Sequence, residues 1–143
     1  MPNIVHSITI AAPAERIHPL VSTGKGLSQW WSADVTELAG GVIELGFFNR
    51  GTVYALKPVS ILPPLDAVWL CTSGKEWAGT RIIFKLERNG AKTLLRFTHA
   101  DWAAETEYFI SCNTTWGALL FRLRAAAEGQ PQGPLFLANS LAY

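Results

Sequence analysis

The sequence has 143 residues, of which 49% are hydrophobic and 16% are charged, a composition typical of one globular domain. A net charge of +1 without clusters of Lys or Arg argues against nucleic acid and anionic lipid as partners. No apolar run reaches the ~18 residues that span a bilayer, and the N-terminus lacks the pattern of a signal peptide. We therefore expect a single cytoplasmic domain over residues 1–143, with no membrane insertion.

The chain begins with a predicted strand over residues 4–10. Its residues alternate, so that one face carries Ile4, His6, Ile8 and Ile10. Pro13 then suits the first turn of a short helix that runs through Leu20.

A second short helix is predicted after Gly24 and ends in Trp30-Trp31. Neighbouring residues on a helix point about 100° apart, so both indoles cannot face one core. We expect one to pack inward and the other to meet a ligand, a loop or solvent.

Short strands and turn signals alternate from Asp34 to Trp102. The predicted strands are 35–38, 42–48, 52–62, 67–72, 77–87 and 93–102, separated by Gly, Asn and Pro clusters. This spacing indicates an antiparallel meander. Lys57-Pro58 interrupts one strand and predicts an edge or a bulge, because proline donates no ladder hydrogen bond.

Alternation along these strands also predicts which side chains face the interior. Charged residues must be solvated, so the opposite sets should be dry: Ala67, Trp69 and Cys71; Ile82, Phe84 and Leu86; Leu95, Phe97 and His99. Two histidines, His6 and His99, therefore fall on the buried side. We expect Cys71 and Cys112 to be buried free thiols, since their spacing fits neither a zinc site nor a redox pair.

A long amphipathic helix is predicted near the C-terminus, starting between Asp101 and Thr106. Its apolar stripe lies within about 60° of Trp116 and comprises Phe109, Cys112, Trp116, Leu119, Leu120, Leu123 and Ala127. Gly129 and Pro131 are expected to end this helix. At about 1.5 Å per residue this helix can cross the whole sheet.

Two apolar residues of this helix, Ile110 and Phe121, lie more than about 100° from the stripe. The tail, residues 129–143, is also apolar. Either the tail folds back over this second surface or the surface contacts a second copy in a homodimer. We expect the tail to pack on the domain.

The order of elements and several single positions resemble a known family. These positions are Trp30-Trp31, Gly40-Gly41, Pro63-Pro64, Trp116-Gly117-Ala118-Leu119-Leu120, Leu123 and Glu128-Gly129. Over nearly all of residues 1–129 the chain is similar to the START-like (SRPBCC) superfamily, and within it to the branch of homologues of the activator of heat-shock protein ATPase.

The resemblance implies an α+β helix-grip fold. In that fold a curved antiparallel sheet of six or seven strands wraps a long C-terminal helix and leaves an apolar cavity between them. Relatives bind lipids, sterols, polyketides or plant hormones there, and a few catalyse cyclisation or dehydration. Trp30, Trp116 and Gly117 match positions that recur in this branch, whereas the tail after Gly129 lies outside the shared pattern.

The candidate site is this cavity, with His6 and His99 as polar anchors. We expect its ligand-binding residues to be His6, Trp30, Phe47, Tyr54, Trp69, Phe84, Phe97, His99, Cys112, Trp116 and Leu120. The same aromatic residues could instead fill the core. We expect no catalytic residue, metal or cofactor: no motif brings Cys112 beside His99, and His6, His18 and His99 lack paired spacing, although Asp101 follows His99 by two residues.

Three functions fit these features. The protein could carry or sense a hydrophobic or aromatic small molecule. It could be a polyketide cyclase or dehydratase-like enzyme with His99 as acid or base. It could be a co-chaperone-like interaction module, as the branch name suggests. We favour binding over catalysis, and both over the interaction module.

Overall fold

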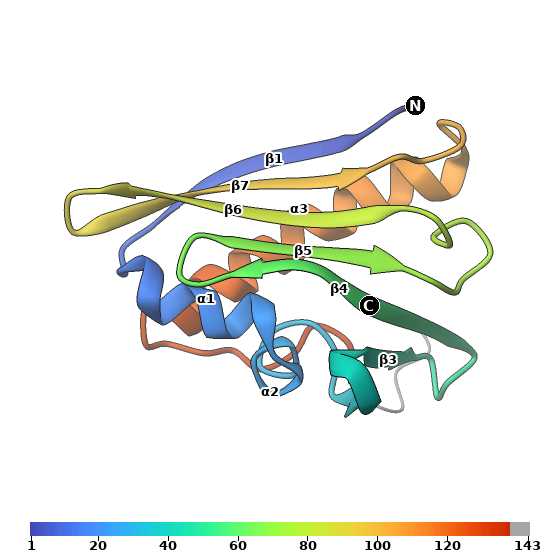
Figure 1. Ribbon diagram of the computed structural model, residues 1–143, viewed down its shortest axis with the longest axis horizontal. Helices are drawn as coiled ribbons and strands as arrows, with labels where there is room; N and C mark the ends of the chain where they lie inside the picture. Colours follow the sequence, from blue (N-terminus) through green and yellow to red (C-terminus); the bar gives the residue numbers. More distant parts are fainter. Residues whose placement is uncertain (138–143) are drawn as a thin grey trace.

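The computed structural model describes residues 1–137 and has an α+β helix-grip fold (Figure 1). A curved, seven-stranded antiparallel sheet has the strand order β1-β7-β6-β5-β4-β3-β2, and the long helix α3 packs on one face of it. The strands are β1 (Ile4–Ile10), β2 (Asp34–Glu37), β3 (Ile43–Phe47), β4 (Thr52–Leu62), β5 (Asp66–Cys71), β6 (Arg81–Asn89) and β7 (Lys92–Ala100). The helices are α1 (Ala14–Ser22), α2 (Gly24–Leu27) and α3 (Glu107–Ala127), and a single 3-10 turn, η1, covers Ala39–Gly41.

Alternation along the strands predicted their inner faces correctly. All nine residues expected to be dry on β5, β6 and β7 are buried. These side chains and the apolar stripe of α3 form one continuous core. Both cysteines are buried free thiols, as expected.

The irregularity expected at Pro58 is a bulge. The pairing of β4 with β5 shifts register between Pro58 and Ser60. On its other side, β4 pairs with β3 only as far as Leu56. Pro58 therefore lies where that side of β4 has no partner strand, so its missing N–H breaks no ladder bond.

The strand expected from Trp77 begins four residues later, at Arg81. Residues 72–80 instead form a folded loop, in which Gly74 and Gly79 have φ angles of +101° and +91° that favour glycine. The amide of Gly79 donates to the carbonyl of Cys71 at 2.9 Å. This loop turns the Trp77 side chain back into the interior.

The helix after Gly24 ends at Leu27, so Trp30 and Trp31 lie in the turns that follow it. Both indoles are buried and stack with ring centroids 5.7 Å apart at 21°. The expectation that they could not both face one core is wrong, because the helical offset of about 100° does not apply beyond the helix end.

Helix α3 has the expected stripe and ends. Every residue of the stripe is buried. The helix starts just after the expected interval: Thr106 is the N-cap, and its hydroxyl accepts a hydrogen bond from the amide of Phe109 at 3.2 Å. Gly129 follows the helix with a φ of +85°, as a C-terminal cap requires.

The segment after α3 packs beside the turn that follows α2. The amide of Phe136 donates to the carbonyl of Trp31 at 3.0 Å, and the carbonyl of Phe136 accepts from the amide of Ala33 at 2.9 Å. The Phe136 side chain is buried, whereas Ile110 and Phe121 remain 53% and 58% exposed. The rest of the predicted tail, residues 138–143, lies outside the described residues.

Within residues 1–137, no helix combines the length and apolar character that crossing a membrane requires.

Candidate functional site

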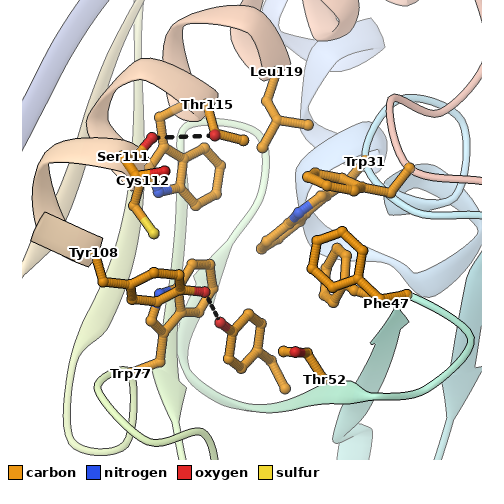
Figure 2. Close-up of a pocket in the computed structure, with 13 residues that line it drawn as sticks. Trp31, Phe47, Thr52, Trp77, Tyr108, Ser111, Cys112, Thr115 and Leu119 are labelled. Carbon is orange, nitrogen blue, oxygen red and sulfur yellow. Dashed lines mark hydrogen bonds between the residues drawn. The ribbon is translucent and has the colours of Figure 1, made fainter. Parts of the chain in front are cut away.

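A pocket of about 170 Å³ opens between the N-terminal half of α3, strands β3 and β4, and the segment around Phe136 (Figure 2). Its walls are mainly aromatic. The lining residues are Trp31, Phe47, Phe48, Thr52, Tyr54, Trp77, Tyr108, Ser111, Cys112, Thr115, Trp116, Leu119 and Phe136. None of these side chains carries a formal charge at neutral pH.

Three indoles from distant parts of the chain form the apolar wall. Trp31 packs against Trp116 with ring centroids 4.9 Å apart, and Trp77 lies nearly parallel to Trp116 at 6.1 Å. Tyr54 stacks on the face of Trp77 at 3.9 Å. Phe136 closes another side with an edge-to-face contact to Phe47 at 5.1 Å. Such close aromatic contacts make a rigid wall.

Hydroxyl groups border this wall. The hydroxyls of Tyr54 on β4 and Tyr108 on α3 are hydrogen-bonded to each other. Figure 2 shows Ser111, Cys112 and Thr115 projecting from the same side of α3 as Tyr108. Burial raises the pKa of Tyr54 and raises the pKa of Tyr108 to about 12. Burial also raises the pKa of the Cys112 thiol. The border therefore offers neutral hydrogen-bonding groups at physiological pH.

A second, more polar hollow of about 340 Å³ adjoins the pocket. It is lined by Gly51, Thr52, Val53, Tyr54, Gly74, Lys75, Glu76 and Tyr108. Thr52, Tyr54 and Tyr108 belong to both linings. The hydrogen-bonded pair of Tyr54 and Tyr108 therefore lies at the boundary between the apolar pocket and the polar hollow.

His99 lies behind the wall and does not line the pocket. The indole N–H of Trp116 donates to Nδ1 of His99 at 3.1 Å, so the imidazole proton is assigned to Nε2. Nε2 lies 2.8 Å from Oγ1 of Thr80 and donates to it, while that hydroxyl donates to the carbonyl of Trp77 at 2.6 Å. Burial lowers the pKa of His99 to about 3, so the ring is neutral. Both ring nitrogens are used in holding Trp116 and the Trp77 loop.

His6 lies on β1, half-buried near Gly117 of α3 and 6.3 Å from the ring of Phe97. Its Nε2 is buried and has no hydrogen-bond partner among the described residues. It does not line the pocket either. The two histidines expected as polar anchors therefore lie outside it, and hydroxyl groups occupy its polar border instead.

Four of the eleven predicted ligand-binding residues line the pocket, namely Phe47, Tyr54, Cys112 and Trp116. The others lie in the core or at its margin: His6, Trp30, Trp69, Phe84, Phe97, His99 and Leu120. Two of these residues hold the end of α1 through their indole N–H groups. Trp30 donates to the carbonyl of Leu20 at 2.8 Å. Trp69 donates to the carbonyl of Val21 at 3.0 Å. They fix the end of α1 to the core.

The other nine lining residues were not among the predicted ligand-binding residues, although Trp31 is one of the two indoles of which one was expected to meet a ligand, a loop or solvent. One signal could have found part of them: Tyr108, Ser111 and Thr115 recur at a spacing of three and four on α3, along one edge of the apolar stripe. Trp77, Phe48 and Phe136 come from loops and from the tail, where periodicity carries no information.

Among residues 1–137, no three His, Cys, Asp or Glu side chains group closely enough to hold a metal ion.

No family model matches the sequence, and no curated protein matches it. The chain resembles the Aha1 dimer of Colwellia psychrerythraea, with 32% identity over 91% of this chain and 98% of that chain and a TM-score of 0.80.

Two further solved structures share the fold at low identity. CalU16 from Micromonospora echinospora is 17% identical over 92% of this chain and 68% of its own, with a TM-score of 0.73. DynU16, a protein in the dynemicin biosynthetic locus, is 14% identical over 92% of this chain and 49% of its own, with a TM-score of 0.72. Because the Colwellia protein matches over nearly the full length of both chains, this chain belongs to the Aha1 family of the START-like superfamily.

Proposed function

We propose that the protein binds a small, neutral, apolar molecule of about the size of one aromatic ring in the pocket between α3 and β3–β4. The observation that carries this proposal is the aromatic pocket itself, with its uncharged hydroxyl border. Sites for drug-sized ligands enclose about 300–1,000 Å³. An apolar cavity of about 150 Å³ can hold benzene. A volume of about 170 Å³ therefore favours a single ring over a sterol or a polyketide.

The border suggests one polar substituent on this ligand. Tyr54, Tyr108 and Ser111 present hydroxyl oxygens, and the raised pKa values keep the tyrosines protonated. A phenolic hydroxyl or a carbonyl group can exchange hydrogen bonds with such groups. A charged substituent would lose its hydration without gaining an ionic partner in the lining.

Catalysis by a cyclase-like mechanism is the alternative that we rank lower. His99, the acid or base expected from the sequence, is neutral, uses both ring nitrogens in hydrogen bonds and lies outside the lining. The thiol of Cys112 is also held in its protonated form. The pocket therefore offers aromatic contacts and hydroxyl groups, which suit binding better than proton transfer near pH 7.

Intrinsic fluorescence tests the binding proposal, because Trp31, Trp77 and Trp116 line the pocket. Titration with phenol or toluene should quench the emission and raise the melting temperature. A ligand at ~100 times its dissociation constant adds about 2.7 kcal/mol to stability. A Ser111→Phe variant should abolish the response by filling the pocket, whereas Asn113→Phe, exposed two residues further on α3, should keep it.

Two outcomes would contradict this proposal. One is a complete lack of response to single-ring ligands in the wild-type protein. The other is an equal response in Ser111→Phe and wild type, which would place the ligand elsewhere.

Family membership motivates a second proposal, a homodimer. The relative from Colwellia psychrerythraea, 32% identical to this chain, is a dimer. Light scattering at micromolar concentration should give about twice the 15.7 kDa mass of the chain. A mass of one chain at 100 µM protein would contradict it.

A co-chaperone-like role, implied by the name of the family, is a third candidate. It predicts that the purified protein stimulates the ATP hydrolysis of a heat-shock ATPase. Reproducible stimulation that persists in Ser111→Phe would rank this role above small-molecule binding, because it would not need the pocket.

A further inference from the structure

The outward face of α3 carries two exposed apolar side chains, Ile110 and Phe121, which the described residues leave uncovered. Counted at about 100° per residue from Trp116, Ile110, Thr114 and Phe121 lie at about 120–160°, away from the buried stripe. The side chains of Ile110 and Phe121 are more than half exposed. The segment after α3 follows a different flank, where Arg122 donates to the carbonyls of Gln132 and Gly133 at 3.2 and 3.1 Å.

This face is complementary to itself. If two copies of α3 pack antiparallel about an axis midway between Thr114 and Gly117, Ile110 of each copy meets Phe121 of the other. Thr114 then meets Gly117 at the crossing. Thr114 has a small side chain and Gly117 has none, which suits the separation of about 8–10 Å between packed helix axes. A contact in which each patch meets its own copy is the geometry of a two-fold dimer.

The charges on this face agree with the same arrangement. Glu107 lies in the first turn of α3 and Arg124 in the last turn. The antiparallel pairing that joins Ile110 to Phe121 also places Glu107 of each copy against Arg124 of the other. A parallel pairing would bring like charges together instead. Within residues 1–137 neither group takes part in an ion pair; the Arg124 guanidinium lies over its own Phe121 ring, 4.8 Å from the centroid.

We propose that two copies of this chain associate through the outward faces of α3, packed antiparallel, with Ile110 against Phe121 and Glu107 against Arg124. This inference rests on the homodimer proposed above and is independent of the ligand pocket. The residues of α3 that line the pocket, among them Tyr108, Ser111 and Thr115, lie on another flank of the helix. The dimer therefore leaves the pocket free.

Disulfide trapping tests the register. Two single variants, Ile110→Cys and Phe121→Cys, are purified separately and then mixed under mild oxidation. The mixture should give a cross-linked species of twice the chain mass. Neither variant alone should do so, because eleven residues of helix, about 16 Å, would separate the two thiols. The native Cys71 and Cys112 are buried and do not compete.

The absence of a cross-link in the mixture would overturn the proposed register. Efficient cross-linking of Ile110→Cys alone would do the same, because it requires the two helices to run parallel or to cross elsewhere.

Surface substitutions test the chemistry of the contact. Phe121→Glu should raise the dimer dissociation constant at least 100-fold, measured by sedimentation. Val59→Glu is the matched control, since Val59 is 57% exposed on β4, and it should leave the constant unchanged. Glu107→Lys and Arg124→Glu should each weaken the dimer several-fold, and the double variant should recover most of the loss.

The results separate the proposals. A monomeric wild type at 100 µM would overturn both the homodimer and this interface. A dimer that is insensitive to Phe121→Glu would overturn the interface alone. In either case the fluorescence response to phenol remains a separate test of the pocket.

Discussion

The indole N–H of Trp116 donates to Nδ1 of His99, joining the wall of the pocket to a buried imidazole at 3.1 Å. The bond leaves the imidazole proton on Nε2, which reaches Thr80 and, through it, the carbonyl of Trp77. One neutral histidine thus holds two of the three pocket indoles.

Stability should fall on acidification because of His99. Burial lowers its pKa to about 3 in the folded protein, below the ordinary value of 6.5. The unfolded chain therefore binds a proton first, so this contribution is complete above about pH 6.5 and is lost as the pH falls toward 3. Denaturant unfolding should show a loss of up to about 1.4 kcal/mol per pH unit in this window. The slope should be shallower in His99→Gln, and parallel curves would contradict the assignment.

Replacing Trp116 by Phe should cost more than replacing another buried indole. Trp116→Phe removes the donor to Nδ1 of His99 and leaves that nitrogen unpaired. Trp102 is equally buried, and its indole nitrogen has no hydrogen-bond partner among the described residues. Trp116→Phe and Trp102→Phe remove the same volume. The difference between them in urea unfolding, about 1–3 kcal/mol, therefore combines the hydrogen bond lost at His99 with the unpaired N–H removed at position 102. Equal losses would indicate that the bond adds nothing.

Removing the Phe136 ring should widen the ligand preference. Phe136 lines the pocket and packs edge-to-face on Phe47 at 5.1 Å. Phe136→Ala should destabilise the fold by about 3 kcal/mol or more and let the pocket accept a two-ring ligand such as naphthalene. Leu137→Ala changes the next residue, whose side chain is exposed, and should alter neither property. Fluorescence titration of the three proteins makes the comparison, and an unchanged ligand range in Phe136→Ala would contradict it.

The glycine in the middle of α3 should be replaceable. A Cβ at Gly117 would find its nearest neighbour, Cε1 of His6, at 4.0 Å, an ordinary contact. Gly117→Ala should therefore stabilise the monomer by about 0.5–1 kcal/mol, because alanine is the better helix former. Gly26→Ala is the opposite case, since its Cβ would lie 2.0 Å from the carbonyl oxygen of Pro19. Thermal unfolding at protein concentrations where the chain is monomeric, so that the proposed dimer contact at Gly117 is absent, should rank Gly117→Ala above wild type and Gly26→Ala below it.

Local periodicity was enough to predict most of the fold. The alternation of Ile82, Phe84 and Leu86 distinguishes the buried face of β6 from its solvent-exposed face. The apolar stripe around Trp116 allows only one buried side for α3. The bulge at Pro58 could be predicted because proline lacks a backbone N–H wherever it occurs in the fold. These features depend on neighbours a few residues apart, so they can be read from the chain without knowing its path.

The residues that line the pocket could not be predicted in this way, because they meet only through the course of the whole chain in the folded protein. Trp31, Trp77 and Phe136 reach it from a turn, a loop and the tail, which meet only after the sheet has curved around α3. No period governs the direction of a side chain in such segments. The sequence by itself determined that an amphipathic helix packs its apolar stripe on an antiparallel sheet. The tertiary structure alone decided that His99 would support the wall while Tyr54 and Tyr108 border the space, because hydrogen bonds between distant residues require their final positions.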